Sequence, residues 1–380
     1  MVKEMIVMKN IKVYPIALFA AAAALVACSK TEVAPVQNDT LAEITYETAP
    51  VTKTIEKFAD GNIFSSIAYY HTGDWDWTAT GKSIFIGSDE DDDGSADGVA
   101  ISKIGNAWKN ADRKYYWPKN GKLTFFAWSL NSSSLVFPDA ANVVIYCTPA
   151  QGVGFFSFNI DKNKNVDFMV ADVASNKTAN EKQYVSTSGV ESGVPTLFKH
   201  KFSKFYFTVK EKEDYEGVKM TLNTIVFKNL ANTASYAQHP DDAVSAMSFS
   251  KSDQTYTDGD AAQEITATAQ PIATDKVDQT IYLPQTFASD TAPIGSTSQI
   301  IEITYTIEYT TSTGGTIKET VTEQKKLCEL FPDAATSGAG IWEKGKKYTL
   351  NLVFALDEIL WDPAVEDWAT EENTVEVPQE

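Results

Sequence analysis

Residues 301–309 read IEITYTIEY, and this stretch decides the fold class because apolar and polar side chains alternate along it. The odd-numbered positions carry isoleucine or tyrosine, and the even-numbered positions carry only glutamate or threonine. A period of two is typical of a β-strand with one buried face. The glycines at positions 314 and 315 then favour a hairpin turn, after which residues 317–322 (IKETVT) return as a second strand.

The same alternation recurs along the chain, whereas the 3.6-residue period of an amphipathic helix is almost absent. It is clear in residues 204–210 (KFYFTVK) and 348–354 (YTLNLVF). Shorter β-branched or aromatic runs lie at residues 84–86, 123–128, 143–146 and 155–158. Many short strands separated by turn residues indicate an all-β fold built of β-sandwiches.

The chain has 380 residues, which suits two domains of about 100–200 residues each. A polar segment without periodicity, residues 174–195, separates the first set of strands from the second. We therefore expect an N-terminal β-sandwich domain at residues 41–190 and a C-terminal one at residues 191–380. A second polar segment, residues 248–269, is expected to be a long loop inside the second domain.

The formal net charge is −19, from 32 basic and 51 acidic side chains. A surface of this charge repels phosphate backbones. The lone arginine, Arg113, leaves no arginine-rich recognition element. We therefore expect no nucleic acid partner.

The first residues have the order of a bacterial lipoprotein signal. Lys9 and Lys12 precede an apolar run, residues 13–27, which is too short for a comfortable membrane span. The run ends in Leu-Val-Ala-Cys, which resembles a lipobox, so Cys28 is the expected lipid-attachment residue. We expect residues 1–27 to be the signal peptide and residues 28–40 a flexible tether. The alternative is a cleaved signal without a lipid.

An acidic stretch, residues 88–99 (SDEDDDGSADGV), is the clearest candidate for a metal-binding loop. Asp89, Asp91 and Asp93, followed by Gly94, match the first half of a calcium-binding loop. The position of the final glutamate ligand is taken by Ala100, and no helix is expected beside the loop. The alternative is a hairpin tip, where Asp and Gly are common. We expect such a tip across Asp89–Asp97, with no bound metal and no cofactor.

Catalysis has little support in the sequence. The histidines, His71, His200 and His239, have neither metal-ligand spacing nor a neighbouring nucleophile motif. The cysteines that remain beyond the lipid site, Cys147 and Cys328, lie far apart and are expected to be buried free thiols. We therefore expect that the protein is not an enzyme.

An aromatic cluster, Tyr69, Tyr70, Trp75 and Trp77, has two interpretations. Exposed rings of this kind stack on sugars, whereas β-sandwich cores also use tryptophan. Core packing is the favoured interpretation.

Five motifs, in this order along the chain, resemble those of the fimbrillin family of Bacteroidetes lipoproteins. They are YWPKNGKLTFFAW at residues 116–128, DFMVA at 167–171, FKHKFSK at 198–204, IYLPQ at 281–285 and GKKYTLNL at 345–352. With the lipobox they cover most of the chain. The third motif departs from the family pattern, with Phe202 in place of leucine.

This resemblance implies two transthyretin-like β-sandwich domains in tandem after a lipoprotein signal peptide. It implies a structural subunit of cell-surface fimbriae that is exported as a lipoprotein precursor, supports adhesion and is linked to the outer membrane by its lipid. The expected partners are other fimbrial subunits and a glycan or protein receptor on host or bacterial surfaces. The alternative is a glycan-binding adhesin that works as a monomer or at a fimbrial tip.

The family also implies polymerisation by strand exchange, in which an N-terminal strand is removed and the C-terminal strand of another subunit replaces it. The candidate removable strand is residues 42–48 (AEITYET), with Ile44 and Tyr46 on one face; the alternative is an ordinary first strand. The protease associated with the best-known members of the family cuts after arginine, which this segment lacks, so Lys53 and Lys57 are the candidate processing residues. The alternative is that the strand is never removed.

The candidate donor strand is residues 373–377 (NTVEV), which carry Val375 and Val377 on one face. Its alternative is a solvated tail.

Overall fold

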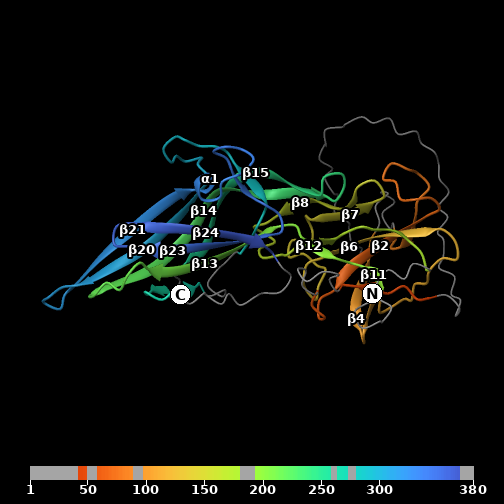
Figure 1. Ribbon diagram of the computed structural model, residues 1–380, viewed down its shortest axis with the longest axis horizontal. Coiled ribbons are helices and arrows are strands. Elements are labelled where there is room, and N and C mark those ends of the chain that lie inside the picture. Colours follow the sequence, from red (N-terminus) through yellow and green to blue (C-terminus); the bar gives the residue numbers. More distant parts are fainter. Residues whose placement is uncertain are drawn as a thin grey trace, which may run out of the picture. The chain divides into compact units, whose positions relative to one another are not determined.

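A computed structural model describes residues 42–48, 58–88, 97–179, 193–257, 263–272 and 280–368 (Figure 1). Within these ranges nearly all of the regular secondary structure is β-strand, with one short helix, α1 (Leu327–Leu330). The predicted all-β fold is therefore confirmed. Several predictions fall outside the described residues: the signal peptide, Cys28, the tether, Lys53, Lys57, residues 89–96 of the acidic stretch, Val375 and Val377.

A ten-stranded sheet forms the first part of the described chain. Its strands are β1 (Tyr46–Glu47), β2 (Phe64–His71), β3 (Ser83–Ile86), β4 (Val99–Ile104), β5 (Ala107–Lys109), β6 (Lys122–Ser129), β9 (Met169–Ala171), β10 (Ala174–Lys177), β11 (Val194–Pro195) and β12 (Phe198–His200). The main path runs β11-β1-β5-β4-β2-β6-β9-β12.

Hydrophobic clusters cover both faces of this sheet. The first cluster contains, among others, Ile44, Tyr46, Phe58, Phe64, Trp108, Phe125, Ala127 and Phe198. The second contains Ile67, Tyr69, Phe126, Trp128, Phe155, Phe158, Phe168 and Phe202. Successive residues of β6 therefore point into different clusters, which explains why its sequence, LTFFAW, is continuously apolar rather than alternating.

Most of the remaining strands form two further sheets, and a third cluster lies between the strands that these sheets take from residues 203–367. The five-stranded sheet contains β13 (Ser203–Glu211), β17 (Gln270–Pro271), β18 (Ile281–Tyr282), β23 (Lys346–Phe354) and β24 (Ile359–Asp367). The seven-stranded sheet contains β7 (Val144–Thr148), β8 (Gly152–Asn159), β14 (Val218–Ala237), β15 (Ala243–Thr257), β16 (Gln263–Ile265), β20 (Ile300–Thr310) and β21 (Thr316–Lys326). A separate pair joins β19 (Gln285–Phe287) to β22 (Gly340–Trp342).

The predicted hairpin is confirmed as β20 and β21, which pair antiparallel from Ile300↔Lys326 to Thr310↔Thr316. Gly314 has a φ of 80°, the conformation that glycine adopts most readily in a turn. Ile303, Tyr305 and Ile307 are fully buried in the third cluster, together with residues of β13, β14 and β23. The inward-facing residues of both sheets thus share one sandwich-like core.

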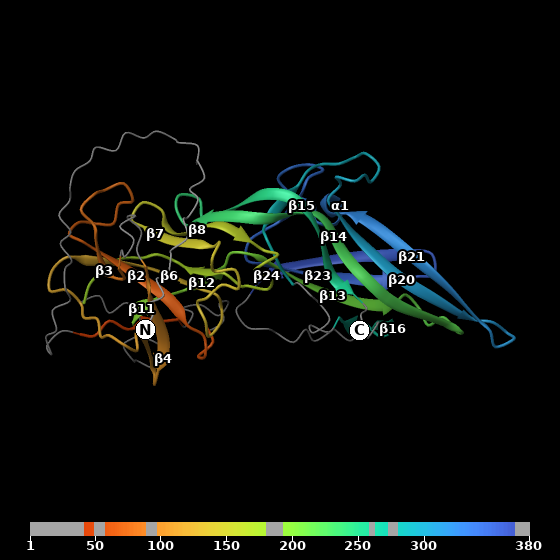
Figure 2. The same ribbon diagram turned by 180° about the vertical axis from the view of Figure 1, so that it is seen from behind.

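Strand β14 lies beside β15 in the ribbon (Figure 2). It is 20 residues long and takes part in two clusters. Its first half, including Leu222 and Phe227, lies in the third cluster and pairs with β20. Its last residues, including Ala234 and Tyr236, lie in the second cluster and pair with β8. One hydrogen-bonded sheet therefore runs from β21 through β14 to β7.

The expectation of a loop across residues 248–269 was wrong for much of that range. Residues 243–257 form β15, which pairs antiparallel with β14 from Thr224↔Thr257 to Ala237↔Ala243. Among the described residues β15 pairs only with β14, so it is an edge strand. Backbone hydrogen bonds hold such a strand without the apolar alternation on which the prediction depended.

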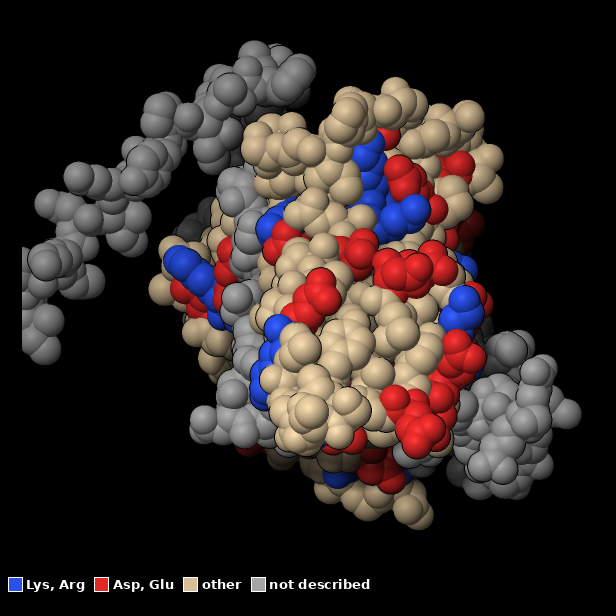
Figure 3. Space-filling model, turned by 90° about the vertical axis from the view of Figure 1, so that its left-hand side faces the viewer, with Lys and Arg blue, Asp and Glu red and all other residues tan. Residues whose placement is uncertain are grey.

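Acidic side chains gather in several patches on the face shown in Figure 3, in keeping with the net charge of −19. No helix among the described residues is long and apolar enough to cross a membrane.

Candidate functional site

The strand formed by residues 42–48 is hydrogen-bonded along both of its edges. On one edge the Ile44 N–H donates to Tyr115 O at 2.8 Å, and the Trp117 N–H donates to Ala42 O at 3.1 Å. On the other edge the Val194 N–H donates to Thr45 O at 2.7 Å, and the Thr196 N–H donates to Glu47 O at 2.8 Å. The strand is therefore inserted between two other segments, antiparallel to β5 and parallel to β11.

The predicted inward face of this strand is the one that the structure buries. Ile44, Tyr46 and Thr48 are 3%, 4% and 3% exposed. The Tyr46 ring meets Phe64 edge-on, with centroids 5.5 Å apart, and Phe125 at 6.0 Å. Burial raises the pKa of the Tyr46 phenol, so the side chain stays neutral at physiological pH. We call the surroundings of this strand the β1 groove, lined by Phe64, Trp108, Tyr115, Phe125, Val194 and Phe198.

A glycine lets the neighbouring backbone approach the inserted strand. A Cβ atom at Gly193 would lie 2.1 Å from Thr45 O and 2.4 Å from Tyr46 N. No side chain fits at that distance, so residue 193 must be glycine while the strand is in place. This role could not be predicted from the sequence, because Gly193 and Thr45 lie about 150 positions apart.

Phe58, which follows the inserted strand in the chain, packs against the residues that line the β1 groove. It is 2% exposed and stacks on Phe198, with ring centroids 4.7 Å apart. It also lies 5.4 Å from Trp108, centroid to centroid. Phe58 comes directly after the candidate processing residue Lys57, so a cut at either lysine leaves it in the chain.

The histidines have structural contacts in the described chain. His71 Nδ1 lies 2.8 Å from Gly73 O and its Nε2 lies 2.9 Å from Thr124 Oγ1, and burial lowers its pKa. His239 stacks on Trp77, with centroids 4.2 Å apart and planes 5° apart. His200 Nδ1 is 2.7 Å from Asp167 Oδ1.

Trp75 and Trp77 pack onto the second cluster and are half-buried. Trp75 meets Phe126 at 5.5 Å and Trp77 meets the same ring at 5.8 Å. The favoured interpretation of this aromatic cluster, core packing, agrees with these contacts.

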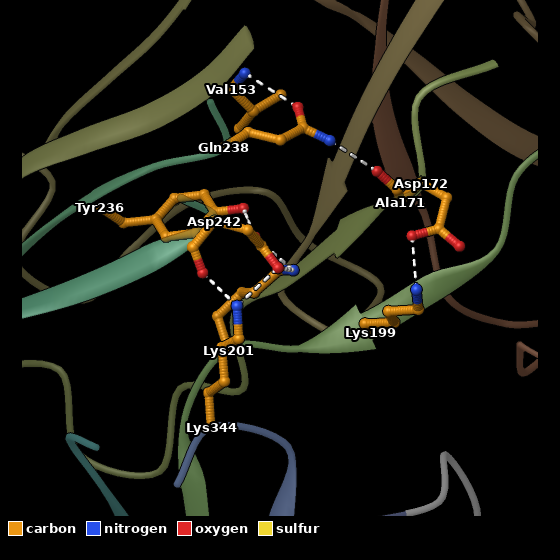
Figure 4. A network of polar contacts seen from close by, with 9 residues as sticks. All are labelled: Val153, Ala171, Asp172, Lys199, Lys201, Tyr236, Gln238, Asp242 and Lys344. Atoms are coloured by element: carbon orange, nitrogen blue, oxygen red, sulfur yellow. Dashed lines mark hydrogen bonds and ion pairs between the residues drawn. The ribbon is translucent and has the colours of Figure 1, made fainter. Parts of the chain in front are cut away.

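A partly buried ion-pair network lies around Asp242, in the turn between β14 and β15 (Figure 4). Lys201 Nζ is 2.8 Å from Asp242 Oδ1, and Lys344 Nζ is 2.6 Å from Oδ2. The Tyr236 hydroxyl donates to Asp242 Oδ1 at 2.5 Å. The network joins the turn to the start of β13 and to the segment before β23, and sequence reasoning did not identify it.

Burial and the neighbouring charges together shift the pKa values of Lys201 and Asp242. Burial lowers the pKa of Lys201, whose side chain is 4% exposed, although Asp242 opposes the shift. Burial alone would raise the pKa of Asp242, but Lys201, Lys344 and the Tyr236 hydroxyl together bring it below its ordinary value. The network is thus a carboxylate held charged between two ammonium groups.

No cluster of His, Cys, Asp and Glu side chains suited to a metal ion occurs in the parts of the chain that the structure describes. Cys147 and Cys328 are free and buried, as predicted. Burial raises the pKa of the Cys147 thiol, which makes it a poor nucleophile.

Several solved structures resemble this chain. A fimbrial protein from Bacteroides vulgatus has 16% identity and a TM-score of 0.55, over 86% of this chain and 99% of that one. A putative cell adhesion protein from Bacteroides uniformis has 16% identity and a TM-score of 0.44, over 87% and 99%. The tip fimbrial protein Mfa3 from Porphyromonas gingivalis has 13% identity and a TM-score of 0.36, over 81% and 96%. The similarity to the Bacteroides vulgatus protein shows a similar fold.

No curated protein sequence matches the chain. A family model described as fimbrillin-like matches residues 70–368, which is most of the chain and includes the five motifs identified in the sequence. The chain therefore belongs to the fimbrillin-like family.

Proposed function

We propose that this chain is a structural subunit of cell-surface fimbriae that polymerises by strand exchange and supports adhesion. Membership of the fimbrillin-like family supports a fimbrial or adhesion role at the cell surface. The observation that carries the finer proposal is the inserted strand at residues 42–48, which is paired on both edges and buried on one face. Its removal would expose two unpaired sheet edges and an apolar groove that only another strand can fill.

The remaining steps of this proposal use residues outside the described ranges. The precursor would be exported, lipidated at Cys28 and held at the outer membrane. A protease would then cut after Lys53 or Lys57, and a strand from another subunit, with residues 373–377 as this chain's own donor, would enter the next groove. We assign no catalytic activity and no cofactor to the protein.

The adhesin alternative finds less support in the described contacts. A sugar-binding platform needs an open aromatic face, whereas Trp77 is covered by His239 and Trp75 by the ammonium of Lys82, which lies 4.3 Å from its ring centroid. A role at the fimbrial tip is compatible with a protein in which residues 42–48 stay in place.

The test is the N-terminal residue of the protein, determined separately in whole cells and in filaments sheared from the surface. Strand exchange predicts that the filament form starts after Lys53 or Lys57. The double variant Lys53→Ala/Lys57→Ala should then remain unprocessed, while the exposed-lysine control Lys119→Ala matures normally. A filament form that still starts at lipidated Cys28 would show that residues 42–48 stay in place and would contradict the proposal.

A further inference from the structure

We propose that the β1 groove selects a partner strand with an aromatic residue at the position of Tyr46, so that its partner is a different fimbrial subunit rather than residues 373–377 of a second copy. This inference rests on the proposed strand exchange. It adds a requirement on the sequence of the incoming strand. That strand must carry an aliphatic residue at the position of Ile44, an aromatic residue at that of Tyr46 and a small residue at that of Thr48.

The backbone of any strand in this groove is held in one path. Hydrogen bonds hold it on both edges, at Tyr115 and Trp117 on one side and at Val194 and Thr196 on the other. Gly193 lies against the strand backbone itself, at Thr45 O and Tyr46 N. Because side chains alternate between faces, a fixed path also fixes which residues point inward.

The surroundings of the Tyr46 side chain suit an aromatic ring. Tyr46 is 4% exposed and makes edge contacts with Phe64 and Phe125, at interplanar angles of 81° and 90°. A valine here would leave both phenylalanine rings without their partner and would create a cavity in the first cluster. The position of Ile44 needs an aliphatic side chain, and that of Thr48 a small one, since both are buried.

The candidate donor of this chain does not meet that requirement. Residues 369–380 read ATEENTVEVPQE and contain no aromatic residue, whichever register or direction they adopt. The nearest aromatic residue, Trp368, stacks on His200. Using it would also place Glu366 and Thr370 at the two flanking inward positions, in either strand direction, and would bury the carboxylate of Glu366. Residues 369–380 of a second copy are therefore the poorer occupant.

The experiment uses the full chain with a recognition site for a specific protease introduced between residues 49 and 57. After cutting of the folded protein, fluorescent peptides compete for the groove. They are residues 40–50, the same peptide with Tyr46→Val, the same peptide with Thr45→Val, residues 370–380, and residues 370–380 with Val375→Tyr. Thr45→Val is the matched control, because Thr45 points away from the groove next to a residue that points into it.

We expect Tyr46→Val to weaken binding about 30-fold or more, which is the usual scale for removing a buried ring, and Thr45→Val to change it less than about threefold. The peptide of residues 370–380 should bind as weakly as Tyr46→Val, and Val375→Tyr should recover most of the loss. If residues 370–380 bind as tightly as residues 40–50, the aromatic requirement is wrong although strand exchange stands.

A different result separates this inference from the proposed function. If no peptide enters, including residues 40–50, the strand is not exchangeable, and both the proposed function and the inference fail. The variant Gly193→Ala in the cut protein should exclude all five peptides alike, because its methyl group meets the peptide backbone and not a side chain. Exclusion of only some peptides would contradict the single backbone path.

Discussion

The indole ring of Trp368 lies flat against the imidazole ring of His200, with centroids 3.8 Å apart and planes 5° apart. Asp167 orients the imidazole, and the Asn131 amide donates to the other oxygen of that carboxylate at 2.9 Å. The Trp368 N–H donates to Gly345 O at 2.8 Å. The end of β24 is thus attached to β12 of the first sheet, and the candidate donor strand begins five residues beyond this attachment.

Replacing Trp368 with alanine should lower the free energy of unfolding by about 1–2 kcal/mol, since a half-buried ring loses its stacking partner. Trp368→Phe keeps a stacking ring and should lose less than half of that. Urea denaturation of both variants checks the prediction. Equal losses would mean that the stack itself contributes little.

Asp242→Asn should lower the free energy of unfolding by about 2 kcal/mol, because Lys201 is buried and would lose its counter-charge. The partial exposure of Asp242 keeps the expected loss below that of a fully buried pair. The matched control is Asp241→Asn, an exposed neighbour, which should change stability by less than about 0.5 kcal/mol. Similar losses in the two variants would argue against the network.

The contribution of Asp242 should depend on pH in a defined direction. Its pKa is lower in the folded protein than the value of about 3.9 expected when unfolded, so its stabilisation is complete above that value. It is then lost as the pH falls through the folded-state pKa. The difference in unfolding free energy between the wild type and Asp242→Asn, measured by urea titration at several pH values, should therefore be constant from pH 7 to 5 and shrink below pH 4. A difference that grows as the pH falls below 4 would contradict this assignment.

Gly193→Ala should destabilise the protein by about 3 kcal/mol, since the new methyl group would overlap the backbone of the inserted strand. Gly61→Ala and Gly73→Ala are the controls, because a Cβ there meets nothing within 4 Å. Thermal unfolding compares the three. If Gly193→Ala resembles the controls, residues 42–48 do not bind as closely as described.

The sequence contained enough information for the fold class and for the face of the inserted strand, because both follow from local alternation. Residues 301–309 and the pair Ile44 and Tyr46 were assigned correctly for this reason. Strand β15 was missed because its pairing uses backbone groups and leaves no apolar pattern.

The partners of the candidate site could not be predicted from the sequence. The parallel pairing of Tyr46 with Val194 joins distant segments, and nothing in a single sequence indicates which segments meet. The same holds for the stacking of His239 on Trp77 and for the charges that converge on Asp242. Alternation predicts which side of a strand is buried, but not what lies against it.

The length of β14 has a mechanical consequence. Its hydrogen bonds to β20 and to β8 lie across the strand, so a force that pulls along it shears many of them at once instead of opening them one by one. Resistance to such pulling is governed by the rate of unfolding under tension and not by equilibrium stability alone. Because the second and third clusters share this strand, the protein resists extension between them until the hydrogen bonds of β14 break together.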